Sequence, residues 1–317
     1  MQRYILRRVA QLVPALLLIT FLVFALMQAI PGDPARMMVG AGESLDEAQL
    51  AMVRHEYNLD RPLPVQYVLW LGRAMPGDLG RSTASQRRVG EELVLRACVT
   101  FELGLFAWLI ATAIAIPAGI IAAAFRGRMP DILATLVAVG AVAMPGFWLG
   151  IMMILLFGVR LGWLPTQGYV ALGDNALDGL RHMVLPALAL GITSAALMMR
   201  QMRSALLEVL TLDYIRTARA KGLGAWAIVL GHALRNALLP VVTVMGLEIG
   251  RIFAGAVVIE TLFGVPGMGR LMVQAVFQRD FPVVQGCVLV MATAVLLVNF
   301  ITDVLYGVLD PRIRFDG

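Results

Sequence analysis

Three ionisable residues stand inside long apolar stretches of this 317-residue sequence and are its first candidates for chemistry. Glu102 lies in one stretch, and Glu248 and Arg251 lie three residues apart in another. An ionisable group within a membrane costs about 2.5–3.5 kcal/mol on insertion scales, and by default it indicates a substrate or ion path. These residues are therefore predicted to line a translocation path. For Glu102 the alternative is a buried, hydrogen-bonded structural acid.

The two charges of the second stretch are expected on one face of a helix. At about 100° per residue, Glu248 and Arg251 point in similar directions. The opposite face carries small residues at a spacing that lets two helices approach closely: Gly246, Gly250 and Ala254. We expect the small residues to pack and the charged face to meet a water-filled cavity. The alternative is a mutually neutralising pair without a role in transport.

Patterns for catalysis or metal binding are missing from the sequence. A phosphate-binding loop needs Gly-x-x-x-x-Gly-Lys followed by Ser or Thr, and the one lysine, Lys221, is followed by Gly222. The apolar stretches hold no Asp pair, Ser/His pair or His-Glu-x-x-His motif, which argues against a membrane-embedded enzyme. The remaining candidates show no metal-ligand spacing and no disulfide framework: His55, His182, His232, Cys98 and Cys287. We therefore predict no catalysis, no metal and no cofactor in this chain.

The composition indicates a membrane protein. Hydrophobic residues make up 59% of the chain and charged ones 15%, whereas soluble domains carry about 25% charged residues. The mean hydropathy is +0.80, and a water-soluble fold of this size could not bury so much apolar surface. The net charge of +5 does not indicate nucleic acid, because the basic residues form short clusters between apolar runs, as the positive-inside rule predicts.

Six apolar runs predict six transmembrane helices in an all-α fold. About twenty apolar residues cross the hydrocarbon, and the runs are 9–30, 97–124, 132–159, 183–199, 238–259 and 281–302. Arginines precede the first run and no cleavage site is evident, so the N-terminus is predicted to be cytoplasmic. The even number of helices returns the C-terminus to the same side. Arginines on that predicted inner side are Arg126, Arg128, those within 200–235, Arg312 and Arg314.

These runs divide the chain into four predicted parts. Residues 1–30 hold the cytoplasmic N-terminal end and helix 1, and residues 31–96 form a periplasmic lobe with Pro/Gly turn signals at 31–34, 62–64 and 76–78. Residues 97–310 are the core transmembrane domain, with a cytoplasmic loop at 200–240, and residues 311–317 are a cytoplasmic tail.

The polar, glycine-rich segment 260–280 lies between the last two runs. We expect an external re-entrant turn near a gate, and an ordinary surface connection is the alternative. The residues expected to shape it are Glu260, Pro266, Gly267, Gly269 and Arg270.

The loop 200–240 is predicted to carry a short, basic, amphipathic helix over 214–221. Asp213 can cap its N-terminus, and Gly222 and Gly224 can end it. Apolar residues recur at helical spacing along the loop: Leu206, Leu207, Leu210, Ile215, Ala218 and Leu223. Such a helix could merely set topology, lie on anionic lipid headgroups, or dock in a groove of a partner.

The segment DYIRTARAKGLGAWAIVLGHALRNALLP at 213–240 closely resembles the coupling loop of permease subunits of dipeptide, oligopeptide and glutathione ATP-binding-cassette (ABC) importers. The general importer loop has Glu-Ala-Ala, a Gly after three further residues, and later Leu-Pro. Aligned on Gly222, the triplet here is Arg216, Thr217 and Ala218. The glutamate is missing and the gap to Pro240 is longer, and the peptide branch shares both departures.

The resemblance extends over nearly the whole chain in the same order. The opening YILRRVAQLVPALLLITFLVFAL and the PGDPAR that follows it look like the start of that family. Further similar segments are GDLGRS at 77–82, LGWLPTQG at 161–168, FGVPGMGRL at 263–271, RDFPVVQG at 279–286 and DVLYGVLDPRIR at 303–314.

This resemblance implies a type I ABC importer permease fold in a bacterial inner membrane. It implies that the chain and a second homologous permease form the path for small peptides delivered by a periplasmic binding protein. Two cytoplasmic ATPase subunits would bind ATP and Mg. The same architecture could import nickel or another small solute. A secondary transporter is the distant alternative, because no internal repeat is evident.

The resemblance also assigns a contact with an ATPase subunit to the segment 213–222. We expect its apolar face and Gly222 to govern docking, and its charges to govern orientation, because exposed ion pairs contribute only about 0–1 kcal/mol each. The residues of this predicted contact are Asp213, Tyr214, Ile215, Arg216, Thr217, Ala218, Arg219, Ala220, Lys221 and Gly222.

Overall fold

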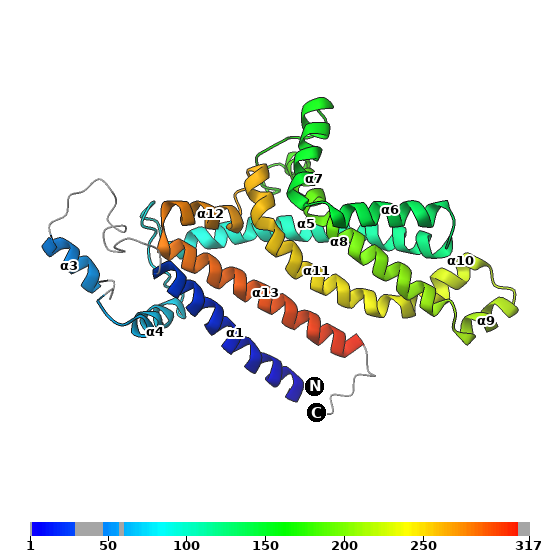
Figure 1. The fold of residues 1–317 in the computed structure, drawn as a ribbon, viewed down its shortest axis with the longest axis horizontal. Helices are drawn as coiled ribbons and strands as arrows, with labels where there is room; N and C mark the ends of the chain where they lie inside the picture. The colour runs from blue at the N-terminus through cyan, green and yellow to red at the C-terminus, as the bar shows by residue number, and fades with distance from the viewer. Residues whose placement is uncertain (1, 29–46, 57–59, 310–317) are drawn as a thin grey trace. The chain divides into compact units, whose positions relative to one another are not determined.

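A computed structural model describes residues 2–28, 47–56 and 60–309 of the chain, and its regular structure is helical (Figure 1). An isolated β-bridge joins Arg81 and Arg88. The all-α prediction is therefore confirmed for these ranges. The predicted turn at 31–34 and the C-terminal tail with Arg312 and Arg314 lie outside the described residues.

The helices follow one another with short connections. They are α1 (Gln2–Gln28), α3 (Glu47–Glu56), α4 (Leu63–Ala74), α5 (Val89–Ala124), α6 (Met129–Ala143), α7 (Gly146–Met153), the π-helical η1 (Ile154–Arg160), α8 (Ala176–Val209), α9 (Asp213–Ala220), α10 (Ala225–Ile228), the π-helical η2 (Val229–Ala233), α11 (Leu234–Phe263), α12 (Met268–Gln278) and α13 (Phe281–Leu309).

The predicted apolar runs are helical wherever they are described. Four continuous stretches are long and apolar enough to cross a membrane: Val89–Ala124, Ala176–Val209, Ala225–Phe263 and Phe281–Thr302. A fifth passes the same test only as a pair, α6 with α7 and η1, and α1 adds the shorter apolar stretch Ala10–Leu26.

The third predicted run is not one straight helix. It breaks between α6 and α7, and the two parts are bent by 107°. Pro145 causes the break, because the residue before a proline is pushed out of the helical region. Met144 accordingly has extended backbone angles, φ −95° and ψ 135°.

The fourth predicted run is also corrected, because α8 extends well beyond residues 183–199 at both ends. Asn175 stands at the N-cap of α8, and its side chain accepts a hydrogen bond from the Asp178 amide. The charged residues on either side of the apolar run do not end the helix, because a helix can continue past the hydrocarbon into a polar setting. The predicted loop 200–240 is therefore mostly helical.

The chain forms two compact units, which we describe separately. The first comprises Met1–Val99 and Pro266–Leu296, and the second comprises Thr100–Val265 and Leu297–Gly317. This grouping follows contacts rather than membrane sides, so the predicted division at residues 30, 96 and 310 stays a prediction.

Helix α8 provides the core of the second unit, and α11 packs along it (Figure 1). Small residues allow this close packing. A Cβ atom added at Gly191 would lie 2.6 Å from the Ala107 carbonyl oxygen of α5, and one at Gly119 would lie 2.9 Å from the Met199 carbonyl oxygen of α8. The end of α8 is thereby held against α5 at the point where the chain enters α9.

Candidate functional site

Helix α9 is the projecting element that the sequence predicted, and its observed bounds differ from 214–221 by one residue at each end. It begins after Leu212, whose ψ of 151° is extended and whose side chain makes no capping hydrogen bond. The prediction that Asp213 caps the helix is therefore wrong, because the cap must stand at the extended residue. Asp213 lies in the first turn instead, and its carboxylate pairs with Arg216 Nη1 at 3.2 Å.

Gly222 ends α9, as predicted, in a Schellman motif. The Gly222 amide donates to the Arg219 carbonyl oxygen at 2.9 Å, and the Leu223 amide donates to the Ala218 carbonyl oxygen at 3.4 Å. Gly222 has a φ of +80°, which a residue with a Cβ rarely adopts. Gly224 has a φ of −64° and precedes α10, so it does not contribute to this ending.

The apolar face of α9 is buried within the chain itself. Ile215 is 0% exposed and Ala218 is 7% exposed. Both belong to a cluster that α5, α8, α10 and α11 complete with Ile120, Ala123, Met202, Leu206, Ile228 and Val241. The expectation that this face docks on a partner is therefore wrong, because the face already anchors α9 to its own unit. Leu223, expected on the same face, is 41% exposed.

The exposed side of α9 is polar. Asp213, Arg216, Thr217 and Ala220 are exposed, and so are Arg219 and Lys221 near the C-terminal end. Tyr214 is partly exposed, and its hydroxyl oxygen accepts a hydrogen bond from Asn236 Nδ2 at 2.8 Å. That bond, which the sequence did not suggest, ties α9 to the first turn of α11.

An ion pair beside α9 was also missed. Arg203 of α8 donates from Nε and Nη2 to the two carboxylate oxygens of Asp131 in α6, at 2.6 and 2.9 Å. Asp131 is 5% exposed and also accepts from the Gly127 amide. Two-pronged pairs of this kind are geometrically specific. The pair therefore fixes the α5–α6 turn to the end of α8 that carries α9. The sequence signal was an acid in the first turn of an apolar run.

The two charges of α11 share a face, as predicted, because Arg251 Nη1 donates to Glu248 Oε1 at 2.6 Å. Their surroundings differ. Glu248 is 1% exposed, whereas the Arg251 side chain is 64% exposed. The expected water-filled cavity is therefore wrong for Glu248, which is buried. Its second oxygen, Oε2, has no hydrogen-bond partner among the described residues. On the other face Gly246 lies against Thr302 of α13.

The other ionisable candidates of the second unit have separate partners. Glu102 is half-buried and accepts a hydrogen bond from the Tyr169 hydroxyl at 2.7 Å. Glu260 is fully buried and accepts from the Thr100 hydroxyl at 2.5 Å. The Glu260 carbonyl also accepts from the Gly264 and Val265 amides where α11 ends. These bonds hold chain segments together, so the candidates do not form one constellation.

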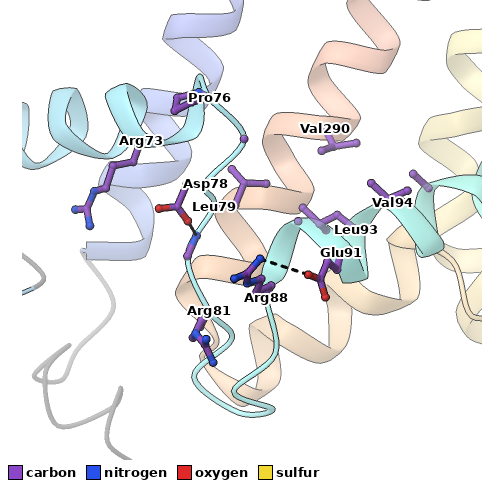
Figure 2. Close-up of a pocket in the computed structure, with 14 residues that line it drawn as sticks. Arg73, Pro76, Asp78, Leu79, Arg81, Arg88, Glu91, Leu93, Val94 and Val290 are labelled. Carbon is purple, nitrogen blue, oxygen red and sulfur yellow. Dashed lines mark hydrogen bonds and ion pairs between the residues drawn. The ribbon is translucent and has the colours of Figure 1, made fainter.

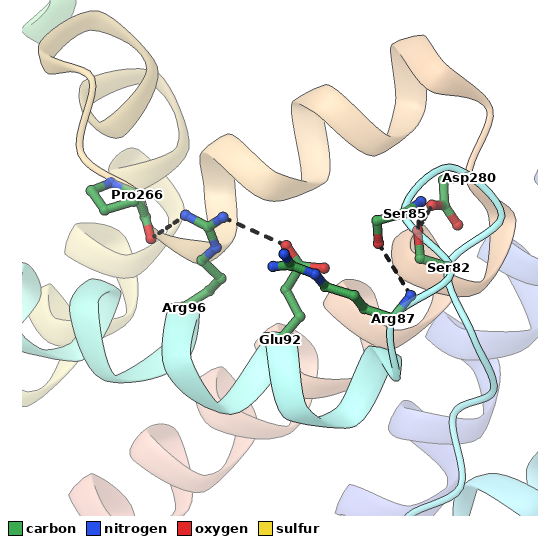
Figure 3. A network of polar contacts seen from close by, with 7 residues as sticks. All are labelled: Ser82, Ser85, Arg87, Glu92, Arg96, Pro266 and Asp280. Atoms are coloured by element: carbon green, nitrogen blue, oxygen red, sulfur yellow. Dashed lines mark hydrogen bonds and ion pairs between the residues drawn. The ribbon is translucent and has the colours of Figure 1, made fainter.

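Much of the segment 260–280 is helix α12 rather than a turn, and this corrects the expectation. Gly267 stands at the N-cap, and Gly269 is buried within the helix. Arg270 is half-buried. The Pro266 carbonyl accepts a hydrogen bond from Arg96 Nη1 at 3.2 Å, and Arg96 also pairs with Glu92 at 3.5 Å (Figure 3). The alternative of an ordinary surface connection does not fit these buried residues either.

Asp280 organises the loop before α5 in the first unit. It is 2% exposed and accepts from the Ser82 hydroxyl at 2.5 Å and from the Thr83 and Ala84 amides (Figure 3). The same loop lines an open cleft of about 1050 Å³, where Arg88 pairs with Glu91 at 3.8 Å (Figure 2). The described residues contain no group of three or more His, Cys, Asp or Glu side chains that could hold a metal ion.

Comparison with known families gives two matches. A model described as "Binding-protein-dependent transport system inner membrane component" matches residues 115–315. A second model, described as "Binding-prot-dependent transport system membrane comp, N-term", matches residues 1–103. Together they cover α9 and both units.

Curated relatives match along the whole length. The dipeptide transport system permease protein DppB of Escherichia coli (strain K12) is 43% identical over 337 residues, covering 99% of each chain. The di/tripeptide transport system permease protein DppB of Pseudomonas aeruginosa (strain UCBPP-PA14) is 42% identical, also covering 99% of each chain. The glutathione transport system permease protein GsiC of Escherichia coli (strain K12) is 41% identical over 99% of this chain and 100% of that protein.

Proposed function

Because the chain belongs to the family of binding-protein-dependent transport system inner membrane components, we propose that it is the permease subunit of an ABC importer of small peptides. The observation that carries this proposal is the 41–43% identity over nearly full length to permeases named for dipeptides, di/tripeptides and glutathione. Glutathione is itself a small peptide, so these relatives share one substrate class.

A second homologous permease would complete the translocation path, and a periplasmic binding protein would deliver the substrate. The energy would come from two ATPase subunits that bind ATP and Mg, since the sequence lacks a phosphate-binding loop around Lys221. These partners are what an inner membrane component of such a system requires.

The ATPase contact would use the exposed polar side of α9. Arg216 and Thr217 are exposed there, whereas Ile215 and Ala218 hold α9 to α5 and α8. A push on the exposed side would then move α9 together with its own unit, because the buried side is close-packed. In this mechanism the apolar face transmits force and the polar face receives it.

The end of the second unit that carries α9 would face the cytoplasm, together with both chain termini. Supporting this orientation, Arg126 and Arg128 line one groove together with Arg219 of α9. Arginines gathered at one end of a bundle favour the inner side.

Arg251 of α11 is the candidate for contact with the path or with the second permease. A mostly exposed guanidinium in the middle of an apolar helix is costly against lipid, so this face is expected to be covered by water or protein. Glu248 beneath it would hold the guanidinium in place through the 2.6 Å bond.

The test is to purify the tagged chain from its own host after mild solubilisation. We expect ATPase subunits, a second permease and ATP hydrolysis to accompany it, while the separated chain hydrolyses nothing. Purification of the chain without any nucleotide-hydrolysing partner would contradict the proposal.

Substrate class is tested on the binding protein that belongs to the same system. Calorimetric titration with dipeptides, tripeptides, glutathione and a nickel complex should show binding of one or more peptides. Binding of nickel alone would keep the importer assignment and overturn the peptide substrate.

A further inference from the structure

A basic groove lies beside α9 at the end of the second unit. Its volume is about 600 Å³. Arg126 and Arg128 come from the α5–α6 turn, and Arg219 comes from α9. The floor is apolar and includes Leu207, Leu210, Ile228 and Val229. Figure 1 shows the α5–α6 turn at the same end of this unit as α9 and α10.

The positive charge of this groove is not balanced within the described part of the chain. None of the residues that line the groove is an acid. The acid of the adjoining turn, Asp131, is taken up by Arg203 and by the Gly127 amide. The groove is thus set up to receive an anion.

The direction of Arg219 separates this groove from the exposed side of α9. At about 100° per residue, Arg219 lies about 70° from the centre of the buried face formed by Ile215 and Ala218, whereas Ala220 lies about 170° from it. Arg219 therefore points sideways toward the α5–α6 turn, and a partner approaching the exposed side would meet Arg216 and Thr217 first. This direction favours a ligand that lies beside the helix.

The position of the groove along the membrane-spanning helices points to lipid. Phe125 and Arg126 directly follow the apolar stretch Val89–Ala124, which puts the groove at the depth of headgroups. Trp226 packs edge-on against Phe125 with ring centroids 6.4 Å apart and is 49% exposed. Tryptophan is enriched at this boundary. Ile121 and Met129 beside it are 42% and 64% exposed, which offers apolar surface for acyl chains.

We propose that this groove binds an anionic phospholipid, with the headgroup phosphate accepting hydrogen bonds from Arg126, Arg128 and Arg219 and the acyl chains lying along the ends of α5 and α6. Basic pockets between helix ends on the cytoplasmic side bind such headgroups. The lipid would join α9 to the α5–α6 turn on the side opposite Tyr214, and would stiffen the segment that receives force. This inference rests on the proposed membrane placement of this end and is independent of the peptide substrate.

The experiment uses the whole complex in nanodiscs of phosphatidylcholine with increasing phosphatidylglycerol, and it counts retained phosphatidylglycerol by native mass spectrometry. The test variant is Arg126→Gln with Arg128→Gln, and Arg235→Gln is the control, since Arg235 is an exposed arginine of the same unit outside the groove. We expect apparent affinity for phosphatidylglycerol to fall about fivefold per arginine removed, with no change in the control. A parallel arm with inorganic phosphate in phosphatidylcholine nanodiscs should leave the groove unfilled.

The outcomes distinguish lipid from other ligands. Equal retention of phosphatidylglycerol in the test variant and the native complex overturns the inference, and so does an equal loss in the control. If the test variant keeps its lipid but loses the ATPase subunits, the groove is a protein contact and the lipid assignment is wrong. If the lipid inference fails while ATPase subunits still co-purify, the proposed importer function stands. The thermal midpoint of each variant reports whether it is folded.

Discussion

Helices α9 and α11 belong to the same unit and distribute charge in opposite ways. In α9 the fully buried residue is Ile215 and the exposed ones include Arg216 and Thr217. In α11 Glu248 is 1% exposed, whereas Leu247 and Val258 are 50% and 51% exposed. The first pattern is that of a helix in water, and the second is that of a helix whose surroundings are apolar.

This contrast shows where each helix spends its interaction energy. Helix α9 uses apolar packing to attach itself to its unit and leaves its charges free for a partner. Helix α11 uses an ion pair inside the unit and leaves apolar side chains for lipid or a second permease. A substitution should therefore have opposite consequences in the two helices, depending on whether it removes charge or apolar volume.

The largest effect is expected where the buried charge of α11 loses its partner. Arg251→Ala would leave Glu248 buried without a counter-ion, which we expect to destabilise the folded chain by about 3 kcal/mol. This is the low end for breaking a buried pair, because Arg251 is mostly exposed. The measurement is the thermal midpoint of the purified complex.

The double variant Glu248→Gln with Arg251→Ala is the control for charge. It should recover most of the lost stability, because a neutral amide needs no counter-ion. If Arg251→Ala alone melts like the native complex, Glu248 is not ionised and the contrast with α9 disappears.

A somewhat smaller effect is expected where α9 loses its apolar anchor. Ile215→Ala removes a fully buried side chain from the cluster with Ile120 and Leu206, at a cost of about 2–4 kcal/mol. Co-purified ATPase should decrease, since α9 would no longer be held in position. Thr217→Ala on the exposed side is the matched control and should leave stability nearly unchanged. Equal melting of the two variants would mean that α9 is not anchored by its own chain.

A moderate effect is expected at the end of α9. Gly222→Ala places a Cβ at a φ of +80° with no atom within 4 Å, so its cost is backbone strain alone, about 1–2 kcal/mol. Gly224→Ala is matched in size and exposure but has a φ of −64°, so it should be neutral. Peptide uptake and substrate-stimulated ATP hydrolysis should fall in the first variant only. Equal behaviour of both would show that the Schellman ending is not required.

The smallest effect on stability is expected at the exposed charges of α9. Arg216→Gln breaks a pair with Asp213 whose side chains are 73% and 94% exposed, so the melting midpoint should shift by less than the equivalent of about 0.5 kcal/mol. ATP hydrolysis by the assembled complex should nevertheless respond less to substrate. Unchanged stimulation would remove Arg216 from the ATPase contact.

Local patterns in the sequence were sufficient to predict α9. A polar start after Leu212, apolar residues at helical spacing and Gly222 at the end gave the helix within one residue. The periodic apolar runs likewise gave the spans, since each depends on neighbouring residues and on the thickness of a bilayer. The break at Pro145 had a visible signal as well, because proline restricts the residue before it.

Which face of α9 meets its own chain could not be predicted in the same way. The pattern showed that Ile215 and Ala218 share a face, but both a partner and the same chain can cover an apolar face. The Asp131–Arg203 pair and the groove of Arg126, Arg128 and Arg219 join residues far apart in the sequence. No local pattern specifies such pairings.

The amino-acid sequence alone determined the class of the protein, its helices and the position of the projecting helix, because hydropathy, periodicity and turn residues act over short distances along the chain. Only the tertiary structure decided that the apolar side of α9 is already covered, that Glu248 is buried while Arg251 is exposed, and that three arginines surround one groove. Burial and charge pairing depend on which helices pack together, and that packing is set by the whole fold.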